Sequence, residues 1–250
     1  MTDNGGPPAL PGDDHDRMAL DVAGYVLGGL TIDEQRGFEA HLATCEVCQD
    51  ELAQLDPVMA DLVALHGPMT VSRRPAVDRR FEQLAESIAY QQLAGRAAAT
   101  IWGRVRGQYG PGPLDPAEVL ATPEESLRAA GLSGAKTAAL LDLARHVDDG
   151  TLMLDRAGRL ADEVVIDQLV AVRGIGRWTA QMFLMFTLHR LDVWPTGDYG
   201  VRTGYGRAFG LDDSPSEREL GELGERFRPY RSVAAWYCWR SVDSPGRSGA

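Results

Sequence analysis

The sequence predicts an all-α protein made of two modules. No stretch of useful length alternates apolar and polar residues in the way that a half-buried strand does. Apolar residues recur at helical spacing instead, as Phe81, Leu84 and Ile88 do. The charge is divided unevenly, since residues 1–69 hold 13 acidic and 2 basic residues whereas residues 70–250 hold 23 of each. The whole net charge of −11 therefore lies in the first quarter of the chain, which indicates modules with different roles.

The composition is that of an ordinary globular protein, with 44% apolar and 24% charged residues. No apolar run approaches the roughly 20 residues that a membrane helix needs, so no membrane partner is expected. The start of the chain is acidic and proline-rich, and it lacks the basic start and the apolar stretch of a secretory signal. We therefore expect a cytoplasmic protein.

Proline and glycine divide the chain further. Pro68 and Pro75 interrupt the helical pattern and predict a linker between the modules. The expected parts are, in order, a flexible tail (residues 1–14), a compact helical segment (15–66), the linker (67–76), a larger helical domain (77–243) and a second tail (244–250).

Within the larger domain, the segment 107–116 is rich in glycine and proline and is expected to separate two helices. Thr122 is predicted to be a helix N-cap, with Pro123 in the first turn and Glu125 three residues on completing a capping box. Further helices are expected over 140–147, 164–172 and 177–188, the last two separated only by Arg173-Gly174-Ile175-Gly176.

Four residues of the first module have the spacing of a metal site. His15, His41, Cys45 and Cys48 form the pattern H-x25-H-x3-C-x2-C. Residues four apart lie on one face of a helix, so His41 and Cys45 can face one ion, and Cys48 follows on the same side. Two imidazoles and two thiolates complete the tetrahedral shell that Zn²⁺ prefers. Because four protein ligands leave no open position, we expect a structural zinc that stabilises a segment too short to fold alone.

This pattern resembles the zinc-binding anti-sigma domain family, and the similarity covers about residues 15–66. The resemblance implies a small zinc-bound helical bundle whose protein partner is a sigma factor. A retained structural scaffold, a redox sensor and an acidic arm are equally open roles for this module.

The larger domain contains two predicted helices joined through Gly-Ile-Gly. Glycine permits tight turn geometry and the close approach of another backbone. The amides of Gly174 and Gly176 then lie at the N-terminus of the second helix, where a phosphate can bind. Thr179 can add a hydroxyl, and Arg173 and Arg177 flank the turn and favour an anionic backbone. These residues indicate a helix–hairpin–helix that grips duplex DNA independently of base sequence.

Asp198 follows the hairpin by about one helix. Pro195 and Gly197 form a loop before it, and a new helical stretch begins directly after it. A carboxylate at the start of a helix is stabilised by the helix dipole and stays ionised. Taken alone, Asp198 is best explained as a simple N-cap; in combination with the hairpin it becomes a candidate catalytic carboxylate.

This combination resembles the helix–hairpin–helix DNA glycosylase superfamily, and within it the bacterial 3-methyladenine-DNA glycosylase II type. The similarity covers about residues 77–243, and the resemblance implies a two-lobed helical fold, double-stranded DNA as partner and a location at the nucleoid. The matching sequence segments are, in this order, Ile88-Ala89-Tyr90-Gln91-Gln92, GIGRWTA (174–180), PTGDY (195–199) and RSVAAWYCW (231–239).

The mechanism that the resemblance implies is base excision. The target nucleotide is flipped out of the duplex and held by stacking. Asp198 stabilises the oxocarbenium character that develops on the sugar, and it orients or deprotonates the attacking water. Cationic alkylated purines such as 3-methyladenine and 7-methylguanine are good leaving groups and stack well on aromatic faces.

The roles of further residues follow from their motif positions. Trp178, Tyr199 and Trp239 are expected to line the base pocket, with core packing as the alternative for Trp178 and Trp239. Gln92 can fill the gap that the flipped base leaves, or it can be an ordinary solvated helix residue. Weaker pocket candidates are Trp236 and Tyr237.

Two absences narrow the class. Bifunctional members carry a lysine just after the hairpin, where this chain has Trp178, so no strand cleavage is expected. Members with an iron–sulfur cluster carry four cysteines, whereas this region contains only Cys238. We expect a monofunctional glycosylase without an iron–sulfur cluster.

Two other functions stay open at this point. In one, the second module only docks on DNA, and the zinc module binds a sigma factor or another partner. Asp198 with its aromatic residues favours the enzyme, because a docking module needs neither. In the other, the acidic first module repels phosphate or occupies the DNA groove of the second module as a mimic.

Overall fold

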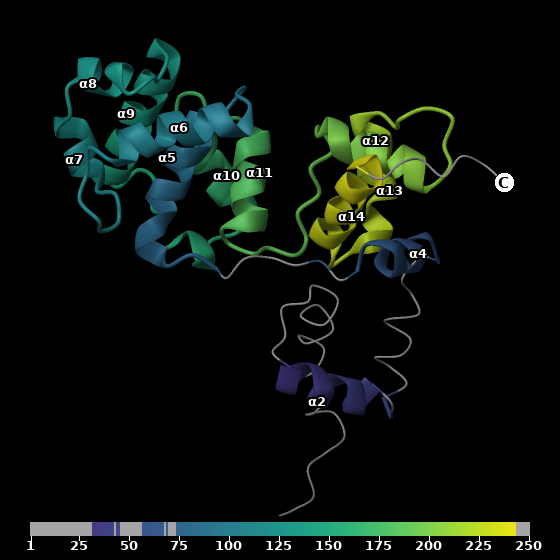
Figure 1. The fold of residues 1–250 in the computed structure, drawn as a ribbon. Coiled ribbons are helices and arrows are strands. Elements are labelled where there is room, and N and C mark those ends of the chain that lie inside the picture. Colours follow the sequence, from purple (N-terminus) through teal and green to yellow (C-terminus); the bar gives the residue numbers. More distant parts are fainter. Residues whose placement is uncertain (1–31, 43, 46–56, 68, 70–73, 244–250) are drawn as a thin grey trace, which may run out of the picture. The chain divides into compact units, whose positions relative to one another are not determined.

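A computed structural model describes residues 32–42, 44–45, 57–67, 69 and 74–243. Every regular element within these ranges is a helix, which confirms the all-α prediction (Figure 1). The chain divides into two compact units, a central unit of residues 73–190 and a terminal unit that combines residues 1–72 with 191–250. None of the helices in the described ranges is long and apolar enough to cross a membrane.

The helices of the central unit confirm the helices that the sequence predicts there, and longer segments separate α6 from α7 and α9 from α10. Helix α9 packs against both α5 and α7, and α10 packs against α11. The bounds are α5 (Arg80–Tyr90), α6 (Gly95–Arg106), α7 (Pro116–Ala121), α8 (Glu124–Ala129), α9 (Gly134–Asp148), α10 (Asp162–Val170) and α11 (Arg177–Phe186), with 3-10 turns η1 (Val77–Arg79) and η2 (Ala157–Arg159).

Helix α5 lies at the core of the central unit. Phe81, Leu84 and Ile88 are buried on one face of it, as their spacing predicts. Arg80, the first residue of the helix, is also buried, and its Nη1 donates to the carbonyl of Leu154 at 2.6 Å. This bond satisfies part of a buried guanidinium and ties the start of α5 to the segment before η2.

The predicted capping box at Thr122 is wrong. Helix α8 begins at Glu124 with Pro123 as its N-cap, and no side chain caps it. The Thr122 hydroxyl instead donates back to the carbonyl of Glu118 at 2.8 Å, because Thr122 ends α7. A capping box forms at α13, where Ser216 and Glu219 exchange hydrogen bonds between side chain and backbone.

The terminal unit is organised around two helices in close contact. Helix α12 packs extensively on α14, and Gly204 makes the approach possible, since a Cβ there would lie 1.8 Å from the carbonyl oxygen of Cys238. An aromatic cluster of Tyr205, Phe209 and Phe227 packs beside these helices. The bounds are α2 (Ile32–Leu42), α4 (Pro57–His66), α12 (Tyr199–Ala208), α13 (Glu217–Leu223), η3 (Glu225–Phe227) and α14 (Arg231–Asp243).

Helix α4 packs against α14, as Figure 1 shows, although the two are far apart in sequence. Leu62 of α4 and Met69 beyond it are buried. The Tyr237 hydroxyl of α14 donates to the carbonyl of Gly67 at 3.0 Å. The end of the first predicted module thus contributes to the core around α14.

Candidate active site and DNA-binding hairpin

Asp198 is the N-cap of α12. Its Oδ1 accepts the backbone N–H of Val201 at 2.7 Å, which is the geometry of an N-cap. The same oxygen accepts the indole N–H of Trp239 from α14 at 2.8 Å. A backbone donor of the helix start and an indole donor from another helix therefore meet at one oxygen of a residue that is only 9% exposed, and they fix the position of that oxygen.

Gly200 allows the Trp239 indole to reach Asp198. A Cβ built at Gly200 would lie 2.7 Å from Trp239 Cδ1 and 3.1 Å from Asp198 Oδ1. Burial raises the pKa of the neighbouring Cys238 thiol, and the negative charge of Asp198 raises it further. The surroundings of Asp198 are thus tightly packed, and the Trp239 indole N–H fixes the orientation of the carboxylate.

The loop before Asp198 is held to the start of α14. Arg231 forms a bidentate ion pair with Asp192, with Nε–Oδ1 at 2.6 Å and Nη2–Oδ2 at 3.0 Å. The Ser232 hydroxyl accepts the backbone N–H of Val193 at 3.0 Å. The sequence pattern includes Arg231 and Ser232 in a matching motif but predicts no role for them. Their partners lie 39 positions earlier, and no local pattern joins them.

The remaining aromatic candidates differ in exposure. Tyr199 directly follows Asp198 and is 77% exposed. Trp178 belongs to the central unit, in the first turn of α11, and is 50% exposed. Trp236 packs edge-on against Tyr237 with ring centroids 4.9 Å apart, and Tyr237 is fully buried in the core of the terminal unit. Tyr199 and Trp178 thus lie at the protein surface, whereas Tyr237 is enclosed.

The hairpin turn lies between α10 and α11. Gly174 adopts φ +80°, and a Cβ there would lie 3.1 Å from the Cβ of Ala139, so both conformation and space require glycine. Ile175 is buried and anchors the turn. Gly176 is exposed and is the N-cap of α11. The first-turn amides of α11 therefore form the kind of helix N-terminus at which phosphates bind.

Acidic side chains form hydrogen bonds with Arg173 and Arg177 of the hairpin. The backbone N–H of Arg173 donates to Asp142 Oδ2 at 2.8 Å. Arg177 makes a two-pronged pair with Glu163, at 3.0 and 2.7 Å, and these hydrogen bonds raise the pKa of Arg177. A phosphate at Arg177 would have to replace Glu163. Thr179 lies on the buried side of α11, at 9% exposure.

The turn of residues 91–93 after α5 forms a tip that is exposed at Gln92 and Leu93. This tip belongs to the same unit as the hairpin. Gln92 follows the end of α5 with φ +56°, an uncommon conformation for a residue other than glycine. Leu93 beside it is 40% exposed. The Gln91 side chain donates from Nε2 to the carbonyl of Gly174 at 3.0 Å. The sequence pattern predicts Gln92 as a DNA contact, contains Gln91 without a role and does not single out Leu93. The role of Gln91 is not visible locally because its bond joins residues 83 positions apart.

The proposed zinc ligands lie partly outside the described residues, since His15 and Cys48 are not among them. Cys45 donates its backbone N–H to the carbonyl of His41 at 3.0 Å, the helical bond that brings both residues to one face. Within the described ranges no three metal-binding side chains come together. An imidazole and a thiolate one helical turn apart are a donor pair that fits zinc.

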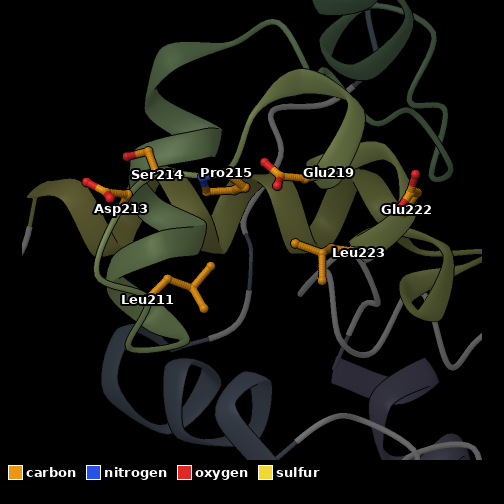
Figure 2. A pocket seen from close by; sticks show the side chains of 7 residues that line it. All are labelled: Leu211, Asp213, Ser214, Pro215, Glu219, Glu222 and Leu223. Carbon is orange, nitrogen blue, oxygen red and sulfur yellow. The ribbon is translucent and has the colours of Figure 1, made fainter.

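A pocket of about 510 Å³ lies in the terminal unit, and none of the predicted site residues is among the residues that line it (Figure 2). Asp213, Glu219 and Glu222 contribute carboxylates to its lining. Such a lining repels phosphate, so this pocket is not the candidate site for DNA. Its other lining residues are Leu211, Ser214, Pro215 and Leu223.

Comparisons with known families agree with both predicted modules. Residues 85–229 match the family described as HhH-GPD superfamily base excision DNA repair protein. Residues 21–49 match a zinc-finger family. The second match includes His41, Cys45 and Cys48 and leaves His15 outside.

Similar proteins point to the same superfamily. DNA-3-methyladenine glycosylase 1 of Schizosaccharomyces pombe is 32% identical over 214 residues, covering 85% of this chain and 92% of the relative. A solved structure of the 3-methyladenine DNA glycosylase of that yeast, in complex with abasic DNA, has TM-score 0.65 at 32% identity and covers 78% and 96% of the two chains. A DNA-3-methyladenine glycosidase structure from Bacillus halodurans has TM-score 0.69 at 33% identity and covers 76% and 86%. The chain belongs to the HhH-GPD superfamily of base excision DNA repair proteins, within which it groups with the DNA-3-methyladenine glycosylases.

Proposed function

We propose that this protein is a monofunctional DNA glycosylase that hydrolyses the N-glycosidic bond of alkylated purines such as 3-methyladenine and 7-methylguanine. The observation that carries the proposal is Asp198, a buried N-cap whose Oδ1 also accepts the Trp239 indole N–H. An N-cap needs only the backbone donor. The second donor, from another helix, fits a carboxylate whose orientation serves chemistry.

In the proposed reaction the bond between C1′ of the sugar and the base nitrogen breaks, and its electron pair leaves with the base. Positive charge develops on the sugar, and the fixed negative charge of Asp198 stabilises it. Water then adds to C1′ and loses a proton, which Asp198 can accept. A base that already carries a positive charge leaves as a neutral molecule, so little acid assistance is needed.

Exposed aromatic side chains are the proposed contacts of the flipped base. Tyr199 adjoins Asp198 in the sequence and is free to stack on an alkylated purine, whose positive charge favours an aromatic face. Trp178, on the first turn of α11, stays a predicted base contact. Because Trp178 occupies the position of the lysine in bifunctional relatives, the product is proposed to be an intact abasic strand.

The proposed DNA contacts lie in the central unit. The N-terminus of α11 with Gly174 and Gly176 would receive a backbone phosphate. Gln92, at the tip after α5, would fill the space of the flipped nucleotide. Leu93 is exposed beside it and adds an apolar surface that can contact the neighbouring bases.

Release of free base from methylated duplex DNA tests this proposal. Purified protein is expected to release 3-methyladenine or 7-methylguanine, and to leave strands that break only after alkali treatment. Strand breaks without alkali would contradict the monofunctional assignment. Absence of any release by folded protein would favour the alternative, a DNA-docking regulator whose zinc module binds a sigma factor or another protein.

For the first module we propose a structural zinc held by His15, His41, Cys45 and Cys48. The donor pair of His41 and Cys45 supports this, and zinc bound there would stabilise the fold of a short segment. Metal analysis is expected to find one zinc per chain, lost in Cys45→Ser and retained in Cys238→Ser. Equal zinc content in both variants would contradict the assignment.

A further inference from the structure

The tip after α5 is tied directly to the hairpin turn. Helix α5 ends at Tyr90, Gln91 turns to φ −50° and ψ 131°, and Gln92 follows in the left-handed region at φ +56°. The Gln91 side chain leaves the tip and donates from Nε2 to the carbonyl of Gly174 at 3.0 Å. One hydrogen bond thus joins the two exposed turns of the central unit, which lie 83 residues apart in the chain.

Helix α9 supports both sides of this contact. Lys136 donates from Nζ to the carbonyl of Ala89 at 2.8 Å, in the last turn of α5 where carbonyls lack helical partners. Asp142 accepts the backbone N–H of Arg173 at 2.8 Å, and Ala139 packs on Gly174. Three side chains spaced along one helix therefore hold the base of the tip and the base of the hairpin.

The side chain that contacts the end of α5 is a lysine. Lys136 is the only lysine in the chain, which has 24 arginines. Its compact ammonium on a flexible stem reaches the Ala89 carbonyl from the first turn of α9. Burial lowers the pKa of Lys136, in agreement with an ammonium directed at the Ala89 carbonyl.

We propose that Gln91 is a positioning residue that locks the tip at Gln92 and Leu93 to the hairpin, so that both turns meet DNA as one preformed surface. This inference rests on the proposed function, in which both turns contact DNA. A left-handed conformation at Gln92 persists only where the surrounding structure imposes it. The bond from Gln91 imposes it before DNA arrives, so that less conformational freedom is lost on binding.

Binding to two duplexes separates this role from general stability. One duplex is undamaged, and the other carries a stable abasic-site analogue next to 2-aminopurine, whose fluorescence reports unstacking. The variant Gln91→Met keeps the length of the side chain and removes its donor. Gln108→Met is the matched control, because Gln108 also donates from Nε2 to a distant carbonyl, that of Ser126 at 3.3 Å, elsewhere in the same unit.

Gln91→Met is expected to bind the undamaged duplex within about twofold of the wild type and to lose about fivefold of the preference for the abasic duplex, the equivalent of one hydrogen bond. The 2-aminopurine signal at saturation is expected to fall. Gln108→Met is expected to keep both. Gln91→Lys restores a donor of similar reach and is expected to regain the preference, since its added charge affects both duplexes alike.

A double variant tests whether Gln91 acts through the tip. Gln92→Ala removes the tip side chain, and adding Gln91→Met is expected to reduce the preference no further than Gln92→Ala alone does. If the two substitutions reduced the preference for the abasic duplex independently, so that their fold losses multiplied, the proposal would be overturned. A Gln91→Met protein that matches the wild type in preference and in fluorescence, whatever its melting temperature, would also overturn it.

The outcomes also separate this inference from the proposed function. A wild type that prefers the abasic duplex and releases base, together with an unaffected Gln91→Met, overturns the inference alone. A wild type that does not distinguish the two duplexes and releases no base overturns both.

Discussion

Asp198 shows how one residue can satisfy two requirements. As an N-cap it stabilises the start of α12 through the bond to Val201, and as a carboxylate it carries a charge that two donors orient. Taken alone, an aspartate before a helix indicates only the first role, and the second was predicted only because the hairpin precedes Asp198 in the sequence. The indole N–H of Trp239 provides the structural reason to consider the second.

Replacing Trp239 by phenylalanine removes that donor and keeps the ring. Loss of one hydrogen bond to a charged group costs about 1.5–3 kcal/mol, so kcat for base release is expected to fall roughly ten- to a hundredfold while KM changes less. Single-turnover kinetics on methylated duplex measure the effect. Trp236→Phe on the same helix is the control, and equal losses in the two variants would show that Trp239 contributes only packing.

At this scale the sequence predicts residue types better than their partners. The turn at Gly174 and Gly176 and the helix start at Asp198 were predictable because both leave local signals. The bond from Trp239 spans 41 positions and depends on how α12 crosses α14, which no local pattern specifies. Gln91 belongs to a matching motif, but the sequence assigns it no role, because its partner also lies far away in the chain.

Among the elements, the crossing of α12 and α14 determines the geometry around Asp198. Gly204 lies at this crossing, and a Cβ there would meet the backbone of Cys238. The helices cannot accept even one methyl group without moving apart, and this would shift Trp239 relative to Asp198.

Gly204→Ala is therefore expected to lower the free energy of unfolding by about 3 kcal/mol, the upper range for overpacking. Gly103→Ala in α6 meets nothing within 4 Å and is expected to raise the free energy of unfolding by about 0.5–1 kcal/mol, because alanine favours the helix. Denaturant titration measures both. Changes of the same sign would contradict the crossing described here.

The hairpin offers a test on a second element. Glu163→Gln removes the partner of Arg177 and a negative charge beside the turn. Duplex affinity at low salt is expected to rise about two- to fivefold, since exposed ion pairs contribute up to about 1 kcal/mol, and the gain is expected to shrink as salt increases.

The control for that experiment is Glu124→Gln on α8, which changes the net charge equally. An equal gain in both variants would mean that only net charge matters, and that Glu163 does not compete with DNA for Arg177.

Helices with clear apolar spacing were predictable, whereas their ends were not. Phe81, Leu84 and Ile88 correctly indicated α5. Thr122 had every sequence feature of an N-cap, yet its hydroxyl turns back to Glu118, because the preceding helix was already within reach. Capping residues act on either neighbour, and only the tertiary structure decides which.

For the whole molecule, the uneven charge raises the question of what the first module does to DNA binding. Residues 1–55 hold eleven acidic and two basic residues. Helix α4, which follows, packs on α14, so an informative deletion must keep it. The sequence predicted an acidic module from composition, but it gave no sign that α4 contributes to the core around α14, because that contact joins the two ends of the chain.

A protein that lacks residues 1–55 is expected to bind duplex DNA more tightly than the full chain at low salt, because the deleted segment repels phosphate. The two affinities are expected to converge at high salt, where such repulsion is screened. Fluorescence anisotropy over a salt series measures this. Identical affinities and salt slopes would show that the acidic module does not modulate DNA binding.

The rate of base release from methylated duplex DNA by Asp198→Asn shows directly whether Asp198 is the catalytic residue. Asparagine remains a good N-cap, so folding and DNA binding should be retained, while the rate should fall at least about a hundredfold with the loss of the charge. Asp115→Asn is the matched control, since Asp115 caps α7 by accepting the Ala117 N–H at 2.9 Å, and it should keep the wild-type rate. Base release by Asp198→Asn at the wild-type rate would contradict the assignment of Asp198 as the catalytic residue.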